Sequence, residues 1–165
     1  MSRKSPYIFF IFSFLLLISS QVAISKPVSV IDPNSVVQAT NQVRAAAGLQ
    51  PLTVSPLLQS ASDEKALDMA VKKYFAHNSP QGQKPWYWIE KNHYDFSSAG
   101  ENLAINYTNA KDLLAAWLES PEHRKNLLNP DYQDIGVGVK NFYYQGREYT
   151  LVVQMFGQTQ VLSMR

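Results

Sequence analysis

The sequence IGVGV at residues 135–139, followed by YTLVVQMF at residues 149–156, is the strongest indication of fold class in this chain. The first stretch alternates at a spacing of two and the second is rich in β-branched and aromatic residues, so both are predicted to be strands. A turn around Gln145 and Gly146 joins them into an antiparallel hairpin. The apolar residues before the hairpin recur at helical spacing. A chain in which helices come first and a hairpin comes last is typical of an α+β fold.

The segment upstream of the hairpin carries helix start and stop signals. The first helix is expected to begin with Asp32 or Asn34 as its N-cap and to stop at Gly48. The second has Ser55 as N-cap and Pro56 at its first position, where the missing N–H costs nothing, and it is expected to end near residues 74–75. Further helices are expected after Pro85, after Thr108 or Asn109, and from Pro121, with an extended segment over 101–107.

The N-terminus has the pattern of a targeting segment. Arg3 and Lys4 precede an apolar run over residues 7–18, and Ala23-Ile24-Ser25 offers small residues for cleavage. The apolar run is shorter than the roughly 20 residues of a membrane span. We therefore expect a cleaved signal peptide over 1–25, no membrane span in the mature chain, and a secreted or periplasmic protein; an uncleaved anchor is the alternative.

Charge and length limit the function classes. The chain has 15 basic and 13 acidic residues, so removing Arg3 and Lys4 leaves 13 of each. A nearly neutral chain without a basic stripe argues against nucleic acid as a partner. The remaining length is enough for one domain, which we expect to be monomeric, with a lead-in at 26–33, the domain over 34–158 and a tail at 159–165.

The chain contains no cysteine. Exported domains often carry disulfides, so this one has to be held together by apolar packing alone. The combination favours a bacterial envelope or secreted protein.

Two histidines and one glutamate form the candidate site. His77 lies in AHNSP, Glu101 in SAGENLA, and His123 in WLESPEHRKNLLNP. Two imidazoles and a carboxylate suit a small metal site or an acid/base cleft. The alternatives are ordinary ones: His77 could satisfy the last carbonyls of a helix, and Glu101 could accept from backbone amides or hold an imidazole in one tautomer.

The sequence offers no clear nucleophile. It lacks cysteine, a Gly-x-Ser-x-Gly elbow and a His-Glu-x-x-His zinc signature. Ser79 and Ser120 lie near the two histidines, which leaves a Ser–His arrangement open, but both precede proline as turn and helix-start serines do. A binding protein is therefore favoured over an enzyme.

Taken in order, the motifs resemble the CAP superfamily of cysteine-rich secretory, antigen 5 and pathogenesis-related-1 proteins, and in particular its disulfide-free bacterial branch of SCP-like extracellular proteins. The resemblance implies an α-β-α sandwich with a small central antiparallel sheet between helical layers. It also implies a cleft in which His77, Glu101 and His123 match the family positions. A second cleft glutamate would be Glu119 or Glu122, and neither falls on the family position unambiguously.

The resemblance further implies a function. We expect an exported binding or effector module whose cleft binds zinc or another divalent metal through His77, His123 and Glu101, with an envelope or extracellular ligand as partner. The alternatives are a metal-assisted hydrolase acting on peptide or envelope polymer, a sterol- or lipid-binding module, and a structural domain with a relic cleft.

Overall fold

The computed structural model describes residues 31–160. The predicted signal peptide, residues 26–30 of the lead-in and residues 161–165 of the tail lie outside the described residues. In chain order the elements are α1 (Pro33–Ala46), β1 (Thr53–Val54), α2 (Pro56–Lys72), α3 (Trp86–Lys91), β2 (Phe96–Ile105), α4 (Ala110–Glu119), α5 (Pro121–Leu127), β3 (Asp134–Tyr144) and β4 (Arg147–Thr159).

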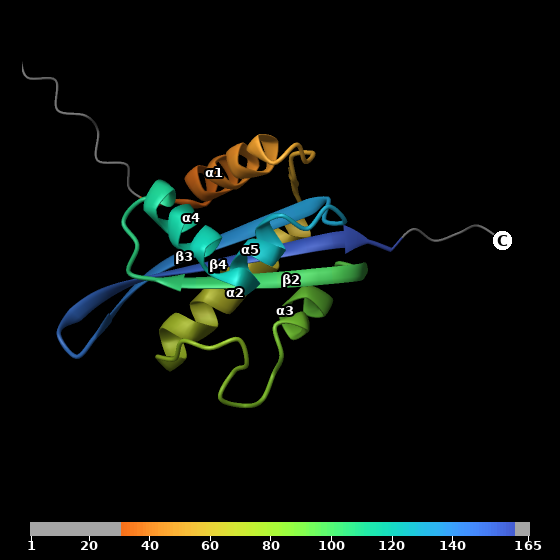
Figure 1. Ribbon diagram of the computed structural model, residues 1–165. Coiled ribbons are helices and arrows are strands. Elements are labelled where there is room, and N and C mark those ends of the chain that lie inside the picture. The colour runs from red at the N-terminus through yellow and green to blue at the C-terminus, as the bar shows by residue number, and fades with distance from the viewer. Residues whose placement is uncertain (1–30, 161–165) are drawn as a thin grey trace, which may run out of the picture.

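The strands form one sheet between two layers of helices. The strand order is β1-β3-β4-β2, in which β2 and β3 both pair antiparallel with β4. Helices α1, α4 and α5 cover one face of the sheet, and α2 and α3 lie on the other (Figure 1). The predicted α-β-α sandwich is confirmed.

Strand β1 was not predicted. Its two residues, Thr53 and Val54, pair in parallel with Asp134 and Ile135 of β3. The sequence predicts only an extended link here, because two exposed residues carry no period of their own. The sheet thus has one short parallel pair at its edge in addition to the expected antiparallel strands.

The glycines of IGVGV allow a helix to lie directly on the hairpin. A Cβ atom at Gly136 would come within 2.2 Å of the Leu58 backbone, and one at Gly138 within 2.3 Å of the Ser62 carbonyl oxygen. Side chains at these two positions would therefore push α2 away from the sheet.

The helix boundaries place the candidate site. Helix α1 begins with a capping box in which the Asp32 side chain accepts from the Ser35 N–H at 3.0 Å. Helix α2 ends at Lys72, slightly earlier than predicted, because Lys73 adopts a left-handed conformation with φ 57°. His77 therefore lies in the loop beyond the helix rather than directly at its end.

Strand β2 differs from the predicted extended segment. It starts at Phe96, before the predicted residue 101, because pairing with β4 extends it to the end of the sheet. It ends at Ile105, since Asn106 has a positive φ of 65° and turns the chain toward α4.

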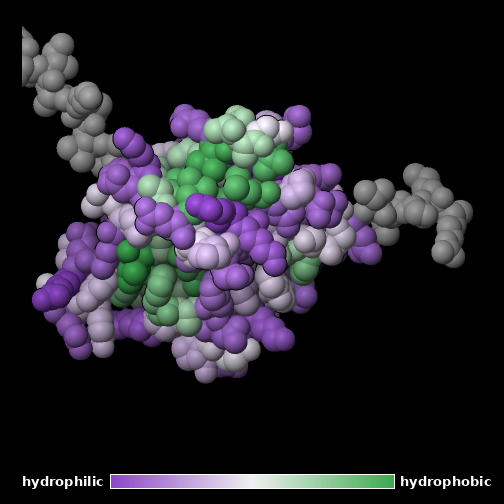
Figure 2. Space-filling view, viewed as in Figure 1, coloured by the Kyte–Doolittle hydropathy of each residue, from purple (hydrophilic) through white to green (hydrophobic). Residues whose placement is uncertain are grey.

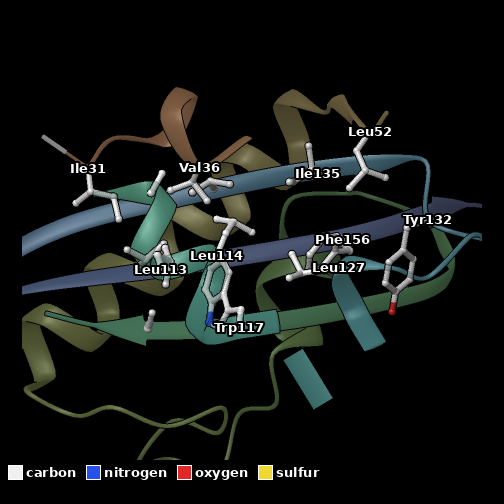
Figure 3. Packing of buried hydrophobic residues seen from close by; sticks show 14 residues of the cluster. Ile31, Val36, Leu52, Leu113, Leu114, Trp117, Leu127, Tyr132, Ile135 and Phe156 are labelled. Atoms are coloured by element: carbon white, nitrogen blue, oxygen red, sulfur yellow. The ribbon is translucent and has the colours of Figure 1, made fainter. Parts of the chain in front are cut away.

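Apolar packing occurs on both sides of the sheet. In the first core, side chains of α1, α4 and α5 meet those of β3 and β4, as Figure 3 shows for Val36, Leu113, Trp117, Ile135 and Phe156. The second core packs α2 and α3 against the opposite face. No helix within residues 31–160 has the length and apolar character to cross a membrane.

Candidate functional site

The three predicted site residues come from three different elements. His77 lies in the loop after α2, Glu101 in β2, and His123 in the first turn of α5. His77 Nδ1 lies 2.6 Å from Glu101 Oε1. The charge of His77 contributes to lowering the pKa of His123, so the two imidazoles share one electrostatic environment.

The His77–Glu101 pair joins an exposed ring to a buried carboxylate. The side chain of His77 is 58% exposed, whereas that of Glu101 is 2% exposed. The hydrogen bond to Glu101 raises the pKa of His77 above its ordinary value. A carboxylate accepts from Nδ1–H, so Nε2 is the ring nitrogen left for a ligand.

Glu101 is only partly satisfied. Burial raises the pKa of its carboxyl group, while the hydrogen bond from His77 and the charge of Lys65 act in the opposite direction. Its Oε2 atom is buried and has no hydrogen-bond partner among residues 31–160. Leaving such an atom unpaired is costly, which is a common sign of a functional position.

Lys65 is a site residue that the sequence analysis missed. Its side chain is fully buried, and its Nζ donates to the carbonyl oxygens of Ala76 at 3.1 Å and His77 at 2.8 Å. The sequence did contain a signal for it: Lys65 lies four residues after Ala61 and four before Met69, and so falls on the apolar stripe of α2. A charge on such a stripe needs partners.

A network of buried polar side chains is hydrogen-bonded to the backbone of His123. Asn102 Nδ2 donates to the His123 carbonyl oxygen at 3.2 Å and to Gln154 Oε1 at 3.3 Å. Gln154 Nε2 in turn donates to Thr40 Oγ1 at 2.8 Å. Asn102 lies within β2 and, through Gln154, connects α5 to α1.

The environment of His123 favours the neutral imidazole. Burial lowers its pKa, the charge of His77 lowers it further, and Glu122 opposes the change. The ring of His123 lies 6.1 Å from that of Trp117, at a tilt of 42°. The two histidines therefore differ: His77 is pushed toward its charged form and His123 toward its neutral form.

The two candidates for a fourth cleft residue both lie outside the hydrogen-bonded cleft. Glu119 and Glu122 are exposed, and Glu119 lines a separate hollow with Arg124, Lys125 and Leu128. Among residues 31–160, the hydrogen bonds and ion pairs of the cleft involve neither glutamate. The two glutamates lie on different helices, because the extended backbone of Ser120 (φ −85°, ψ 120°) separates the end of α4 from the start of α5.

An apolar groove continues from His123. It has a volume of about 340 Å³ and lies along the end of β2, beneath the junction of α4 and α5. Its lining residues are Phe75, Leu103, Ala104, Ile105, Tyr107, Ala116, Trp117, Ser120 and His123. Figure 2 shows an apolar area on the left of this face, near the C-terminal end of β2, and a second between α1 and α4.

The hydroxyl of Ser79 takes part in the turn that follows His77. Its hydroxyl donates to Gln83 Oε1 at 3.3 Å and accepts from the N–H groups of Gln81 and Gln83. These bonds close the turn after His77 and keep Ser79 buried. Ser79 is therefore a turn residue, as its position before proline suggests.

The donor set fits a metal ion only in part. In the part of the chain that the structure describes, no three His, Asp or Glu side chains converge so that they could jointly hold an ion. Glu101 contacts Nδ1 of His77 instead, which is the place of an outer-shell carboxylate. Two imidazoles would remain as direct protein ligands, fewer than the three or four typical of zinc sites.

Comparison with known proteins places these features in one family. The model of the cysteine-rich secretory protein family, CAP, matches residues 37–156. Two Bacillus subtilis proteins are each 38% identical: the uncharacterized protein YkwD over 99 residues, and the uncharacterized membrane protein YlbC over 105 residues. The matches cover 60% and 64% of this chain but only 38% and 30% of those proteins, so the chain spans about a third of their length.

Solved structures share the fold. An extracellular protein containing an SCP domain from Bacillus anthracis superposes with a TM-score of 0.67 at 28% identity, over 77% of this chain and 40% of that one. An outer surface protein from Borrelia burgdorferi gives 0.65 at 23% identity, over 75% and 90% of the two chains. The second likeness is one of fold alone.

Proposed function

Since the chain belongs to the cysteine-rich secretory protein family (CAP), we propose that it is an exported binding module for an amphipathic ligand. The polar end of the ligand would contact His77 and His123, and its apolar part would lie in the groove beside them. Export is supported by the N-terminal sequence pattern and by the description of the Bacillus anthracis protein with an SCP domain as extracellular.

One observation carries this proposal: the cleft and the groove are parts of the same surface. His123 is both a cleft histidine and a lining residue of the groove, and Phe75, another lining residue, precedes His77 by only two residues. Ligand sites in proteins combine a mostly apolar wall with a few placed polar groups. The volume of about 340 Å³ is at the lower end of such sites and suits a slender apolar chain.

The charges of the cleft favour an anionic or strongly polar head group. The raised pKa of His77, caused mainly by its bond to Glu101, favours a cation there. Lys65 adds a second cation beneath the carboxylate. The neutral form of His123 has both a donor and an acceptor nitrogen for a hydroxyl or carboxylate group.

A fluorescent fatty acid tests the proposal. We would titrate dansyl-undecanoic acid into the wild-type domain, Phe75→Ser and Val71→Ser. Phe75 lines the groove and is 45% exposed, whereas Val71 is 69% exposed on α2 outside the groove. We expect Phe75→Ser to weaken binding about tenfold, or ~1.4 kcal/mol, and Val71→Ser to leave it unchanged. Equal effects of the two variants, or no binding by the wild type, would contradict the proposal.

A further inference from the structure

Lys65 is a fully buried cation on the face of α2 that packs against the sheet. Burying an ammonium group is expensive unless its donors are satisfied. All three donors of Nζ have partners: the Tyr74 hydroxyl at 3.1 Å and the carbonyl oxygens of Ala76 and His77 at 3.1 and 2.8 Å. Burial of this ammonium group therefore costs free energy, which the three hydrogen bonds offset.

Two aromatic rings complete a cage around this ammonium. Nζ lies 4.2 Å from the ring centroid of Trp88 and 4.9 Å from that of Tyr74. A cation over the face of an aromatic ring is stabilised, most strongly when it is removed from water. Trp88 is itself buried in α3, so the cage lies between α2, which carries Lys65, and α3.

The loop held by Lys65 has little else to fix it at His77. The chain leaves α2 through the left-handed Lys73, and His77 follows without regular secondary structure. The His77 side chain is 58% exposed, so apolar packing does not place it. Its ring position depends on the backbone beneath it and on the hydrogen bond to Glu101.

The same ammonium also acts on the partner of His77. Burial raises the pKa of Glu101, and the nearby charge of Lys65 opposes that change. Lys65 therefore contacts the backbone of His77 directly and stabilises the ionised form of the carboxylate to which the ring binds.

We infer that Lys65 is a positioning residue of the binding site, whose buried ammonium holds the carbonyls of Ala76 and His77 and thereby seats the His77 ring on Glu101. The inference rests on the proposed function only in taking the seated ring as the polar end of the ligand site. The placement of the ring itself is a property of the free protein.

The absence of cysteine from the whole chain allows a clean test. Lys65→Cys would be unfolded, alkylated at its single thiol and refolded in two forms. Aminoethylation restores an ammonium at nearly the length of lysine, and carbamidomethylation leaves a neutral amide. The matched control is Lys72→Cys treated identically, because Lys72 is exposed and its ammonium contacts Asp68 and Gln81 instead.

The readout is the proton resonance of the His77 Nδ1–H group bonded to a buried carboxylate, assigned by its loss in Glu101→Gln. We expect the signal in the wild type, in the aminoethylated Lys65→Cys protein and in both Lys72→Cys controls. We expect it to disappear in the carbamidomethylated Lys65→Cys protein while the remaining spectrum stays that of a folded chain. A wild-type signal in the folded amide form would overturn the inference.

A second variant covers the case in which the amide form does not fold. Lys65→Arg keeps the charge but moves the donors, so we expect a folded protein with a displaced or weakened His77 signal. An unchanged signal in Lys65→Arg would also overturn the inference. None of these measurements uses a ligand, so failure here leaves the fatty-acid titration standing, and failure of that titration leaves the role of Lys65 intact.

Discussion

His77 and Glu101 are 24 residues apart in the chain, yet His77 Nδ1 lies 2.6 Å from Glu101 Oε1, with the ring exposed and the carboxylate buried. The buried partner fixes which ring nitrogen is engaged and leaves the other available to a ligand. This pair is the reason that an exposed loop histidine can belong to a defined site.

The stability of the domain should depend on the protonation of His77. Its pKa is raised in the folded chain by the bond to Glu101, so the pair stabilises the fold below the ordinary imidazole pKa of about 6.5, and that contribution disappears as the pH rises through the raised value. We expect His77→Gln to lower the free energy of unfolding more at pH 5.5 than at pH 8.5, by roughly 0.5–1 kcal/mol after solvent screening. Urea unfolding of the wild type and of His77→Gln at the two pH values measures this difference in the free energy of unfolding. A penalty that does not change with pH would exclude the linkage.

The buried network under His123 should be strongly coupled. Thr40→Val removes the acceptor of Gln154 Nε2 and leaves a buried donor unpaired, which costs about 1–3 kcal/mol. Replacing both partners, as in Thr40→Val with Gln154→Leu, should destabilise by less than the sum of the single changes. Chemical denaturation of the wild type, the two single variants and the double variant completes this double-mutant cycle. Strictly additive free energies of unfolding would show that the hydrogen bond between Gln154 and Thr40 contributes nothing to stability.

A methyl group at Gly136 should be poorly tolerated. A Cβ atom at this position would lie 2.2 Å from the Leu58 carbonyl group, which belongs to the backbone of α2 and cannot move without shifting the helix. We expect Gly136→Ala to lower the free energy of unfolding by at least ~2 kcal/mol, in the upper range for overpacking. Gly82→Asn is the control for crowding, because Gly82 has open space around it; its φ of 82° strains any side chain, but asparagine adopts positive φ more often than most residues, so we expect a smaller loss. Equal thermal midpoints for the two variants would mean that α2 is not seated as described.

Zinc should bind weakly and only through both imidazoles. Two nitrogen ligands with an outer-shell carboxylate leave coordination positions to water. Calorimetric titration should show modest affinity in the wild type, none in His77→Ala with His123→Ala, and a reduced affinity in Glu101→Gln. His93→Ala is a suitable control, because His93 is exposed and outside the cleft. Zinc binding that survives the double substitution would place the metal elsewhere.

Local sequence signals predicted most of the fold. The capping residues Asp32, Ser55 and Asn109 each accept the hydrogen bond expected of an N-cap, because a cap depends on residues only three positions away. The hairpin turn lies at Gln145 and Gly146 as predicted, and both residues have a positive φ, which glycine adopts freely and glutamine only rarely. Strand β1 and the first residues of β2 were missed, because their pairing partners are distant in the chain.

Part of the candidate site was also readable from sequence. The motifs around His77, Glu101 and His123 indicated the family that the comparison shows and predicted a cleft, and the structure brings His77 and Glu101 into contact. The fourth residue was not readable, since the bend between α4 and α5 decides which way Glu119 and Glu122 point. The groove was not readable either, because its walls come from a loop, a strand and two helices.

The order of helices and strands, the turn of the hairpin and the family could be predicted from the sequence, because these depend on spacing over a few residues. The fold was needed to show that Lys65 donates to the loop of His77 and that Gln154 donates to Thr40, 114 positions away in the chain. A buried polar side chain has to find its partner wherever packing places one, and short-range spacing carries no record of that partner. For the pair of His77 and Glu101, the sequence predicted both residues, and the fold set the distance between them.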